Sequence, residues 1–387
     1  MTSLRSALKS ATALAAFSLS FPLASWAEEP LPVVATFSIL GDMVERIGGE
    51  HIALTTLVGP DGDAHVYQPT PKAARSVAEA DVLFLNGLEF EGWLERLAES
   101  ASFDGAMVVA TKGVVPIAFD DHDDHDDHDD HDEHADHDDH ADHDDHADHD
   151  DHDDHADHDD HADHDDHADH DDHDDHDKHA DHDDHDKHAD HDDHDDHDGH
   201  DNHDDHAGHD HGAFDPHAWH SLENAVIYAN NIAAGLAQAD PENAGDYYAN
   251  RATFISEIET LSADIEAMMK SLPADKRTVV TPHDAFGYFA ATYDLTFVAP
   301  QGMSTESEVA AGDVAALITQ IREDSISAVF IESITDNRMM EQIANETGAT
   351  IGGTLYSDAL SAQSGPASTY LDMMRHNATT LFDALRN

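Results

Sequence analysis

The sequence predicts an α/β protein of two lobes, each a parallel sheet with covering helices, joined by a long linker helix. Short apolar strands alternate with helices in two separate blocks of the chain, which is the pattern of parallel sheets covered by helices. Between the blocks lies helical sequence long enough to connect two lobes. A run of 92 residues, 120–211, consists almost wholly of Asp, His and Ala and interrupts this pattern.

The first block extends from residue 31 to residue 111. Its predicted strands are 31–37, 51–58, 81–87 and 107–111, and its predicted helices are 39–49, 72–80 and 89–100. In the first helix, Ile39, Met43 and Ile47 recur at helical spacing before a Gly-Gly stop. A loop rich in Gly, Pro and Asp, 59–71, separates the second strand from the second helix.

The same alternation returns near the carboxyl end of the chain. The predicted strands there are 277–281, 295–300, 327–333 and 349–355, and the predicted helices are 284–293, 308–324, 337–348 and 370–385. The helical sequence between the blocks is 221–239 and 240–271. For the second piece, Asp240 is the expected N-cap and Pro241 the first helical residue, where a missing N–H does no harm.

The apolar residues of 240–271 recur at intervals of three and four, so we expect one face of a single helix to be buried. These residues are Ile255, Ile258, Leu261, Ile265 and Met268. A helix of about thirty residues is about 45 Å long at 1.5 Å per residue and can connect two lobes. Two shorter helices packed within one lobe are the alternative.

The amino terminus has the pattern of an export signal. Arg5 and Lys9 precede an apolar stretch, 11–23, and small residues follow at Ser25 and Ala27. The apolar stretch is shorter than the about 20 residues that a membrane span needs. Since the chain contains no Cys, it has no disulfide, no thiolate metal ligand and no site for a lipid after the signal. We therefore expect a free periplasmic protein with no membrane anchor, acting as a monomer.

These observations divide the chain into six segments. We expect a signal peptide at 1–27, an N-terminal lobe at 28–119 with its remainder at 212–239, a disordered His/Asp-rich metal-binding loop at 120–211, a linker helix at 240–271 and a C-terminal lobe at 272–387.

The acidic run has the most unusual composition in the chain. Its 47 acidic residues and two lysines contribute 45 of the 68 net negative charges, and it contains 31 of the 37 His. With no apolar residue larger than Ala, the run cannot offset the entropy of ordering, so we expect disorder. Imidazoles among carboxylates favour weak, multiple metal binding. A repeat expansion tolerated as a solvated loop is the alternative, and so much negative charge argues against nucleic acid as a partner.

Six His lie outside the run, and three of them are in loops that suit a binding site. The six are His51, His65, His217, His220, His283 and His376. His65 and His283 each follow a predicted strand, where ligands of open α/β sheets gather, and His217 precedes a helix. We assign no site role to the other three, and we expect Tyr67, Trp219 and Phe286 to pack around the site.

With these motifs the sequence resembles the zinc and manganese substrate-binding proteins of ABC importers, in particular the zinc-uptake ZnuA type. The resembling segments are GDAHVYQPTP at 62–71, DPHAW at 215–219, HDAFGYFA at 283–290, VFIE at 329–332 and YLDMMRHN at 370–377. An acidic His-rich insertion between the first two of these motifs is typical of the zinc members. The resemblance spans nearly all of the chain after the signal.

The resemblance implies a metal site in the cleft between the lobes, with His65, His217, His283 and Asp358 as ligands. Asp358 lies in the segment GTLYSDALS, which differs from the commoner Asp-Pro-Leu-Gly motif of the family. Three neutral imidazoles with one carboxylate or water suit tetrahedral zinc, whereas manganese prefers more oxygen ligands.

The function implied is capture of Zn²⁺, as transported ligand, and its delivery to the membrane permease of a zinc importer. The protein would then be no enzyme. A periplasmic zinc buffer acting through the run is one alternative. A zinc hydrolase is another, although the chain has no H-E-x-x-H motif and Asp284 is the only acid directly beside a proposed ligand.

Overall fold

The computed structural model describes residues 29–118, 214–305 and 309–386. The expected signal peptide, 1–27, and the acidic run, 120–211, lie outside the described residues, so the structure does not test the expectations for them. Among the described residues, no helix combines the length and apolar character that crossing a membrane would require.

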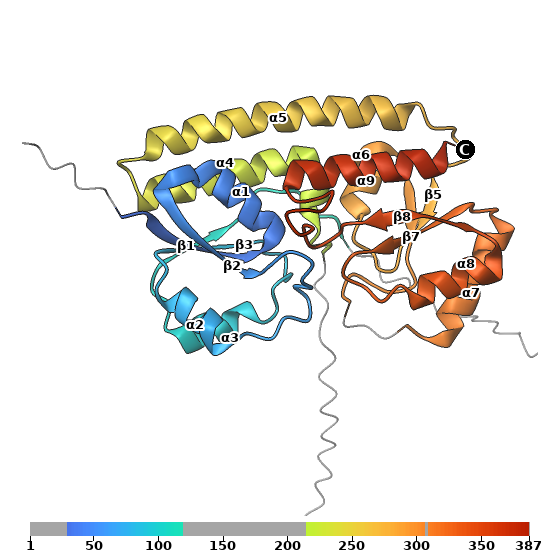
Figure 1. Cartoon of the computed structure of the whole chain (residues 1–387), viewed down its shortest axis with the longest axis horizontal. Coiled ribbons are helices and arrows are strands. Elements are labelled where there is room, and N and C mark those ends of the chain that lie inside the picture. The colour runs from blue at the N-terminus through green and yellow to red at the C-terminus, as the bar shows by residue number, and fades with distance from the viewer. Residues whose placement is uncertain (1–28, 119–213, 306–308, 387) are drawn as a thin grey trace, which may run out of the picture. The chain divides into compact units, whose positions relative to one another are not determined.

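The described residues form two lobes, each with a four-stranded parallel sheet (Figure 1). The first sheet has the order β2(Ile52–Val58), β1(Leu31–Phe37), β3(Val82–Leu85), β4(Ala106–Val109), and the second has the order β6(Thr296–Val298), β5(Thr278–Val280), β7(Ala328–Glu332), β8(Thr350–Leu355). In each sheet the first strand of the lobe therefore lies between the second and the third, and the fourth lies at the edge beside the third. The prediction of two parallel sheets with covering helices is confirmed.

The helices follow the predicted alternation. In the first lobe they are α1(Ser38–Gly48), α2(Pro71–Ala78), α3(Leu94–Ala101) and α4(Leu222–Ala239), with the short turns η1(Gly49–His51) and η2(Ala218–His220). The long helix α5(Ala244–Lys270) follows, and then come α6(Gly287–Tyr293), α7(Ala311–Glu323), α8(Arg338–Thr347) and α9(Tyr370–Leu385). Because α5 packs on α1 and α4 of the first lobe and on α6 and α9, it runs along both lobes (Figure 1).

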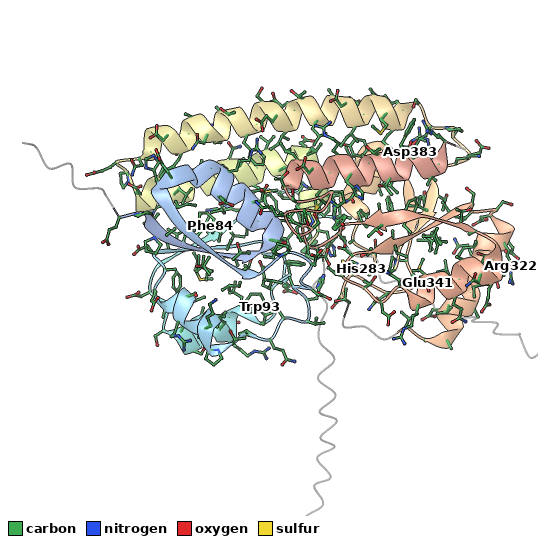
Figure 2. The ribbon with its side chains drawn as sticks, viewed as in Figure 1. Phe84, Trp93, His283, Arg322, Glu341 and Asp383 are labelled. Carbon is green, nitrogen blue, oxygen red and sulfur yellow. The ribbon has the colours of Figure 1, made fainter. Side chains whose placement is uncertain are left out.

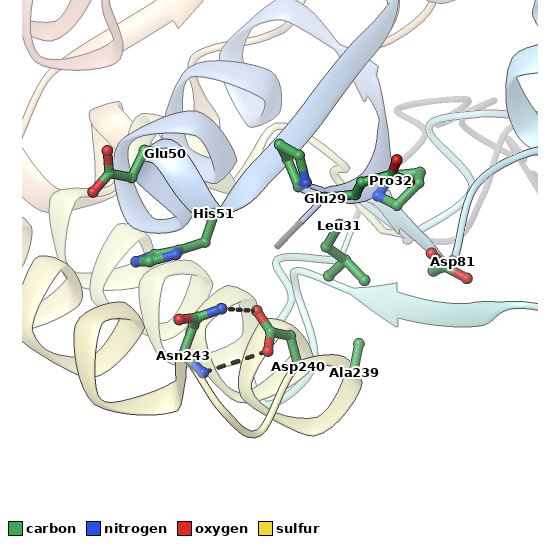
Figure 3. A pocket seen from close by; sticks show the side chains of 10 residues that line it. Glu29, Leu31, Pro32, Glu50, His51, Asp81, Ala239, Asp240 and Asn243 are labelled. Atoms are coloured by element: carbon green, nitrogen blue, oxygen red, sulfur yellow. Dashed lines mark hydrogen bonds between the residues drawn. The ribbon is translucent and has the colours of Figure 1, made fainter. Parts of the chain in front are cut away.

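The long helix is a single helix, as predicted, but it begins later than predicted. Its 27 residues make it about 40 Å long. The assignment of Asp240 as N-cap and Pro241 as first helical residue is wrong, because the helix starts at Ala244. The Asp240 carboxylate instead accepts hydrogen bonds from the Asn243 side chain (Figure 3) and from the Tyr247 hydroxyl, at 2.8 and 2.6 Å. These bonds favour a turn ahead of the helix.

The buried stripe of α5 is close to the predicted one. Its buried apolar residues are Tyr247, Phe254, Ile258, Leu261, Ile265 and Met269. Ile255 and Met268, which were expected in the stripe, are half-buried at its margins. The 3.6-residue period places Met269 rather than Met268 below Ile265.

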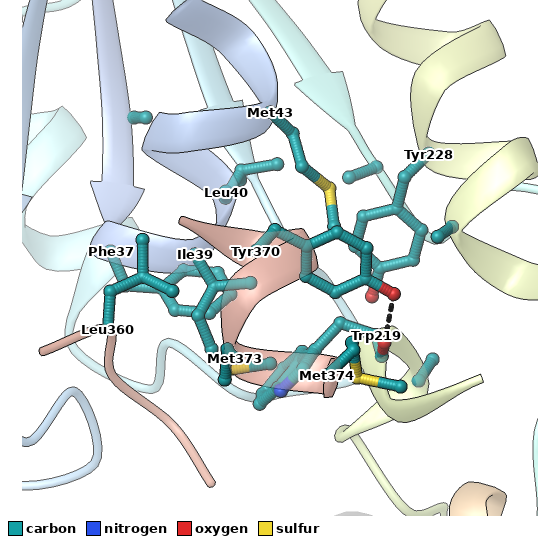
Figure 4. Close-up of a cluster of buried hydrophobic side chains, with 14 of the residues drawn as sticks. Phe37, Ile39, Leu40, Met43, Trp219, Tyr228, Leu360, Tyr370, Met373 and Met374 are labelled. Atoms are coloured by element: carbon teal, nitrogen blue, oxygen red, sulfur yellow. Dashed lines mark hydrogen bonds between the residues drawn. The ribbon is translucent and has the colours of Figure 1, made fainter. Parts of the chain in front are cut away.

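The main hydrophobic core joins the first lobe to α9 (Figure 4). Phe37, Leu40 and Met43 of the first lobe lie beside Tyr370 and Met373 of α9, all almost fully buried. A smaller core lies among α7, α8 and the second sheet. The last helix of the chain therefore buries its apolar face partly against the first lobe, and the two lobes share one core.

Asp42 of α1 gives this shared core a pH dependence. Its Oδ2 accepts a hydrogen bond from the Tyr370 backbone N–H at 2.9 Å. Burial raises the pKa of Asp42 from 3.8 to about 6, even though this hydrogen bond and Arg46 act to lower it. Below about pH 4 the carboxyl is protonated in both the folded and the unfolded chain. As the pH rises from about 4 to 6, its ionisation therefore favours unfolding.

We expect Asp42→Asn to raise the free energy of unfolding at pH 7.5 by about 1 to 3 kcal/mol, since one pKa unit corresponds to about 1.4 kcal/mol. The amide oxygen can still accept the Tyr370 N–H. The gain should shrink toward zero at pH 4. Urea unfolding of the metal-free protein at both pH values measures it, and a gain of equal size at both would contradict the assignment.

Candidate metal centre

Four side chains from separate parts of the chain meet between the lobes. Each of His65, His217, His283 and Asp358 offers one atom, and these atoms all lie within 4.8 Å of one another. Asp358 Oδ2 is 3.2 Å from Nε2 of His65 and 3.2 Å from Nε2 of His283, and its Oδ1 is 3.6 Å from Nε2 of His217. Figure 2 places His283 between the two lobes. The structure thus brings together the four residues that the sequence singled out.

The facing atoms of this group are buried and carry no hydrogen bond. They are Nε2 of the three His and both oxygens of Asp358. The side chains of His217, His283 and Asp358 are fully buried, and that of His65 is 7% exposed. Unpaired buried polar atoms are costly, so a set of facing acceptors of this kind is suited to a bound cation.

His65 lies in the loop between β2 and α2, which is fixed by two hydrogen bonds. The backbone N–H of His65 donates to Asp63 Oδ1 at 2.9 Å, and the Trp93 indole N–H donates to the Ala64 carbonyl at 2.8 Å. Tyr67, which we expected to pack near the site, contacts the Trp93 ring at a centroid distance of 4.8 Å. The loop geometry therefore orients His65 toward the other three side chains.

His217 stands directly before η2, and Asp215 orients it. Asp215 Oδ1 accepts both the backbone N–H and the Nδ1–H of His217, each at 2.8 Å. Because a carboxylate only accepts, the ring carries its proton on Nδ1 and leaves Nε2 free for a metal. The Asn86 side chain at the end of β3 donates to the Pro216 carbonyl at 2.8 Å and fixes the segment to the first sheet.

His283 follows β5, and Glu332 ends the neighbouring strand β7. Glu332 Oε2 lies 2.5 Å from Nδ1 of His283 and accepts the Ser357 hydroxyl at 2.8 Å. The carboxyl ends of β5 and β7 adjoin where the strand order changes direction, which is where open α/β sheets bind ligands. The sequence reasoning assigned no role to Glu332. The sequence feature that could have indicated a role is the position of this acid as the last residue of a buried apolar strand.

The segment that carries Asp358 is fixed to the first lobe as well as to the second. The Ser357 carbonyl accepts hydrogen bonds from the Trp219 indole N–H at 2.9 Å and from His220 Nε2 at 3.0 Å. The Leu360 N–H donates to the Ser38 hydroxyl at 2.9 Å. Asp358 therefore lies in a segment, 357–360, that forms hydrogen bonds with the first lobe both before and after Asp358. We call this segment the strap.

His220, to which the sequence gave no role, is thus a support for this strap. Burial, and next the neighbouring His217, lower its pKa to about 3, so the ring is neutral and can donate its Nε2–H. The ring of Phe286 lies beside it at a centroid distance of 4.6 Å, with the two rings tilted by 40°. Ser221 is the N-cap of α4, and its hydroxyl accepts the Asn224 N–H.

The charges inside the group are coupled. Burial alone would lower the pKa of His283, but Glu332 and Asp358 raise it well above its usual range. Burial would raise the pKa of Asp358, but the charges of His283 and His217, and next the close contacts with His283 and His65, lower it well below its usual range. The carboxylates and imidazoles of the group therefore interact strongly, and a divalent cation bound among them would displace any proton from the ligand atoms.

The remaining His take no part in this group. His51 Nε2 is 3.0 Å from Asp246, and the ring is half-buried. His376 bonds to the Thr354 carbonyl at 3.0 Å. The pocket beside His51 is lined by four acidic residues, Glu29, Glu50, Asp81 and Asp240 (Figure 3). Within the part of the chain that the structure describes, however, His65, His217, His283 and Asp358 are the group found with metal-ligating spacing.

Two α/β lobes with a buried group of three imidazoles and one carboxylate between them define a metal-binding protein of the substrate-binding class. Residues 33–384 match the family model "Zinc-uptake complex component A periplasmic", and the chain belongs to this family. It is therefore the substrate-binding component of a metal ABC transporter, which implies a membrane permease as partner, and it is not an enzyme. The hydrolase alternative is thereby excluded.

Relatives of the chain are named for several metals. The manganese-binding lipoprotein MntA of Halalkalibacterium halodurans is 25% identical over 358 residues, which cover 92% of this chain and 89% of that protein. The iron-binding protein YfeA of Yersinia pestis is 26% identical over 349 residues, 90% of this chain and 84% of that protein.

Solved structures share the fold. The periplasmic zinc binding protein TroA from Treponema pallidum matches with a TM-score of 0.67 at 21% identity, covering 93% of this chain and all of that one. A periplasmic metal binding protein from Candidatus Liberibacter asiaticus matches with a TM-score of 0.62 at 24% identity, covering 91% of this chain and 98% of that one.

Proposed function

We propose that the protein binds one Zn²⁺ in the cleft between its lobes and delivers it to the permease of a zinc importer. The proposed ligands are Nε2 of His65, His217 and His283 and the carboxylate of Asp358. The observation that carries the proposal is the burial of these four groups at metal-ligating spacing. Since transport makes and breaks no covalent bond, no residue needs a catalytic role.

The donor set supports zinc over manganese. Ligand atoms of a tetrahedral zinc site with bonds of 2.0 to 2.2 Å are about 3.3 to 3.6 Å apart. The distances from Asp358 oxygens to the three Nε2 atoms are 3.2, 3.2 and 3.6 Å. Manganese prefers a larger number of oxygen donors than one carboxylate supplies. Relatives are named for manganese, iron and zinc, so the proposal of zinc rests on the donor set of this chain.

We also propose that the protein is free in the periplasm. The signal pattern at 1–27 supports export, and a chain without Cys has no residue to which a lipid could be attached after the signal. Several relatives are named lipoproteins, so on this proposal the present chain differs from them in having no lipid.

For the acidic run, 120–211, we propose a collecting role. Its 31 His among carboxylates would bind zinc weakly at many places and raise the local supply of ions to the cleft. The buffer alternative assigns the run nearly all of the binding. The two alternatives differ in what remains when the run is removed.

Competition calorimetry at pH 7.5, on the full chain and on a chain lacking 120–211, tests these proposals. We expect one tight zinc site in both chains, with zinc preferred over manganese by at least about a hundredfold, and fewer weak sites after the deletion. Preference for manganese would contradict the assignment of zinc. Loss of the tight site on deletion of the run would favour the buffer alternative.

Growth at limiting zinc tests the collecting role of the run separately. Unchanged growth of cells that carry the protein without 120–211 would contradict this role.

A further inference from the structure

One side of the metal group is nearer to solvent than the others. His65 is the member with an exposed fraction, 7%, whereas the side chains of His217, His283 and Asp358 are fully buried. Val66, next to His65, is 44% exposed. An ion that enters or leaves with little rearrangement of the core therefore passes the edge of His65. The loops that meet at this edge determine how easily it does so.

The first of these loops carries Asp63, which uses both of its oxygens. Asp63 Oδ1 accepts the backbone N–H of His65 at 2.9 Å. Asp63 Oδ2 accepts the hydroxyl of Thr305 at 2.6 Å, and Thr305 belongs to the second lobe. Both residues are half-buried. A hydrogen bond to an ionised carboxylate is stronger than one between neutral groups, so this bond is a firm connection between the lobes.

The second loop, 301–305, is bound to the backbone around His283. The Gln301 N–H donates to the Pro282 carbonyl at 3.3 Å, and the Asp284 N–H donates to the Gly302 carbonyl at 3.2 Å. The Gln301 side chain donates to the Thr305 carbonyl at 2.8 Å and shapes the end of the loop. The Asp63–Thr305 bond thus connects the loop of His65 with the loop of His283.

The opposite side of the site is joined much more extensively. There the Tyr288 hydroxyl donates to the Asp215 carbonyl at 3.0 Å, and the ring of Phe286 contacts that of His220. Trp219 and Tyr370 belong to the shared core. Separation of the lobes on that side would expose buried aromatic surface, whereas separation of loop 301–305 from the loop of His65 breaks the Asp63–Thr305 bond without exposing that core.

We propose that the Asp63–Thr305 hydrogen bond is a clasp that limits the rate at which zinc enters and leaves the cleft. This inference rests on the proposed function of the site. Asp63 and Thr305 touch no metal, and they are positioning residues that act through the loops of His65 and His283. With the bond formed, the two loops stay closed over the exposed edge of His65. With the bond broken, the loops separate and the ion exchanges.

Stopped-flow zinc exchange on the full chain tests this inference. The protein is loaded with one equivalent of zinc and mixed with excess fluorescent chelator, and the cleft is identified as the slow phase that is absent in His217→Ala. We expect Thr305→Val to raise the dissociation rate about tenfold, the typical effect of losing one hydrogen bond to a charged group. The association rate should rise by a similar factor, so that the dissociation constant changes little.

Two matched variants accompany the test. Thr305→Ser keeps the hydroxyl and should restore the parent rates. Thr319→Val makes the same chemical change on α7, where the hydroxyl bonds only locally to the Ala315 carbonyl, and should leave both rates unchanged. Circular dichroism confirms that each variant is folded.

Three results would overturn the inference, and they are distinguishable. Rates for Thr305→Val within twofold of those for Thr319→Val would show that the bond does not limit exchange. A faster dissociation with an unchanged association rate would show that the bond only orients His65. Absence, in the parent protein, of any slow phase that depends on His217 would remove the proposed function itself.

Discussion

Replacing His217 by Ala is expected to weaken zinc binding in the cleft by at least about a hundredfold. Structural zinc sites with four ligands contribute about 10 to 16 kcal/mol, or roughly 3 kcal/mol for each ligand, and 1.4 kcal/mol is a factor of ten. His217 is fully buried and preset by Asp215, so no neighbouring water or side chain takes its place without rearrangement. Competition with a chelator of known zinc affinity measures the loss.

His51→Ala is the matched control for this prediction. His51 is also a His of the described chain with a carboxylate partner, but it lies outside the metal group. Its removal should leave the tight site unchanged. An affinity in His217→Ala within tenfold of the parent would mean that the tight site lies elsewhere, and the acidic run would then be the first place to search.

Replacing Trp219 by Ala is expected to lower the free energy of unfolding by about 3 to 5 kcal/mol, the usual effect of truncating a fully buried Trp. The indole is buried among Phe37, Phe90 and His217, with ring centroids 5.0, 4.9 and 5.3 Å away. Its N–H also binds the Ser357 carbonyl next to Asp358. The variant should therefore lose zinc affinity together with stability, as urea unfolding and chelator competition would show.

Two further variants separate the packing effect from the hydrogen bond. Trp219→Phe keeps much of the apolar contact but leaves the Ser357 carbonyl with one donor fewer, so we expect a smaller loss of about 1 to 2 kcal/mol. Tyr248→Ala removes an aromatic ring that is 45% exposed on α5 and should change stability by less than about 0.5 kcal/mol. A Trp219→Ala loss no larger than that of Tyr248→Ala would contradict the account of the core.

The parts of the fold that depend on local patterns could be predicted from the sequence. Strands such as 31–37 and 327–333 are apolar runs between loop residues, and the buried apolar residues of α5 extend over about six turns. The start of α5 could not be predicted, because Asp is a favoured N-cap residue and Asp240 therefore looked like the start of the helix. In the structure the Asp240 carboxylate instead accepts hydrogen bonds from Asn243 and Tyr247, and the helix begins at Ala244.

The candidate site was predictable to different degrees for different residues. His65 and His283 follow strands and His217 precedes a helix, and these three positions together with the His-rich run suggested a common site. Asp358 is one acid among many, and only the family resemblance pointed to it. Glu332 contacts Nδ1 of His283 directly, and His220 binds the Ser357 carbonyl beside Asp358, although both contacts join segments far apart in the sequence. Contacts of this kind depend on tertiary packing and cannot be predicted from the neighbouring sequence.

Anomalous diffraction at the zinc absorption edge, from crystals of the protein loaded with one equivalent of zinc, tests the central claim most directly. The account predicts one dominant peak within about 2.0 to 2.2 Å of Nε2 of His65, His217 and His283 and of an Asp358 oxygen. A dominant peak elsewhere, with these four side chains still facing one another unligated, would contradict it.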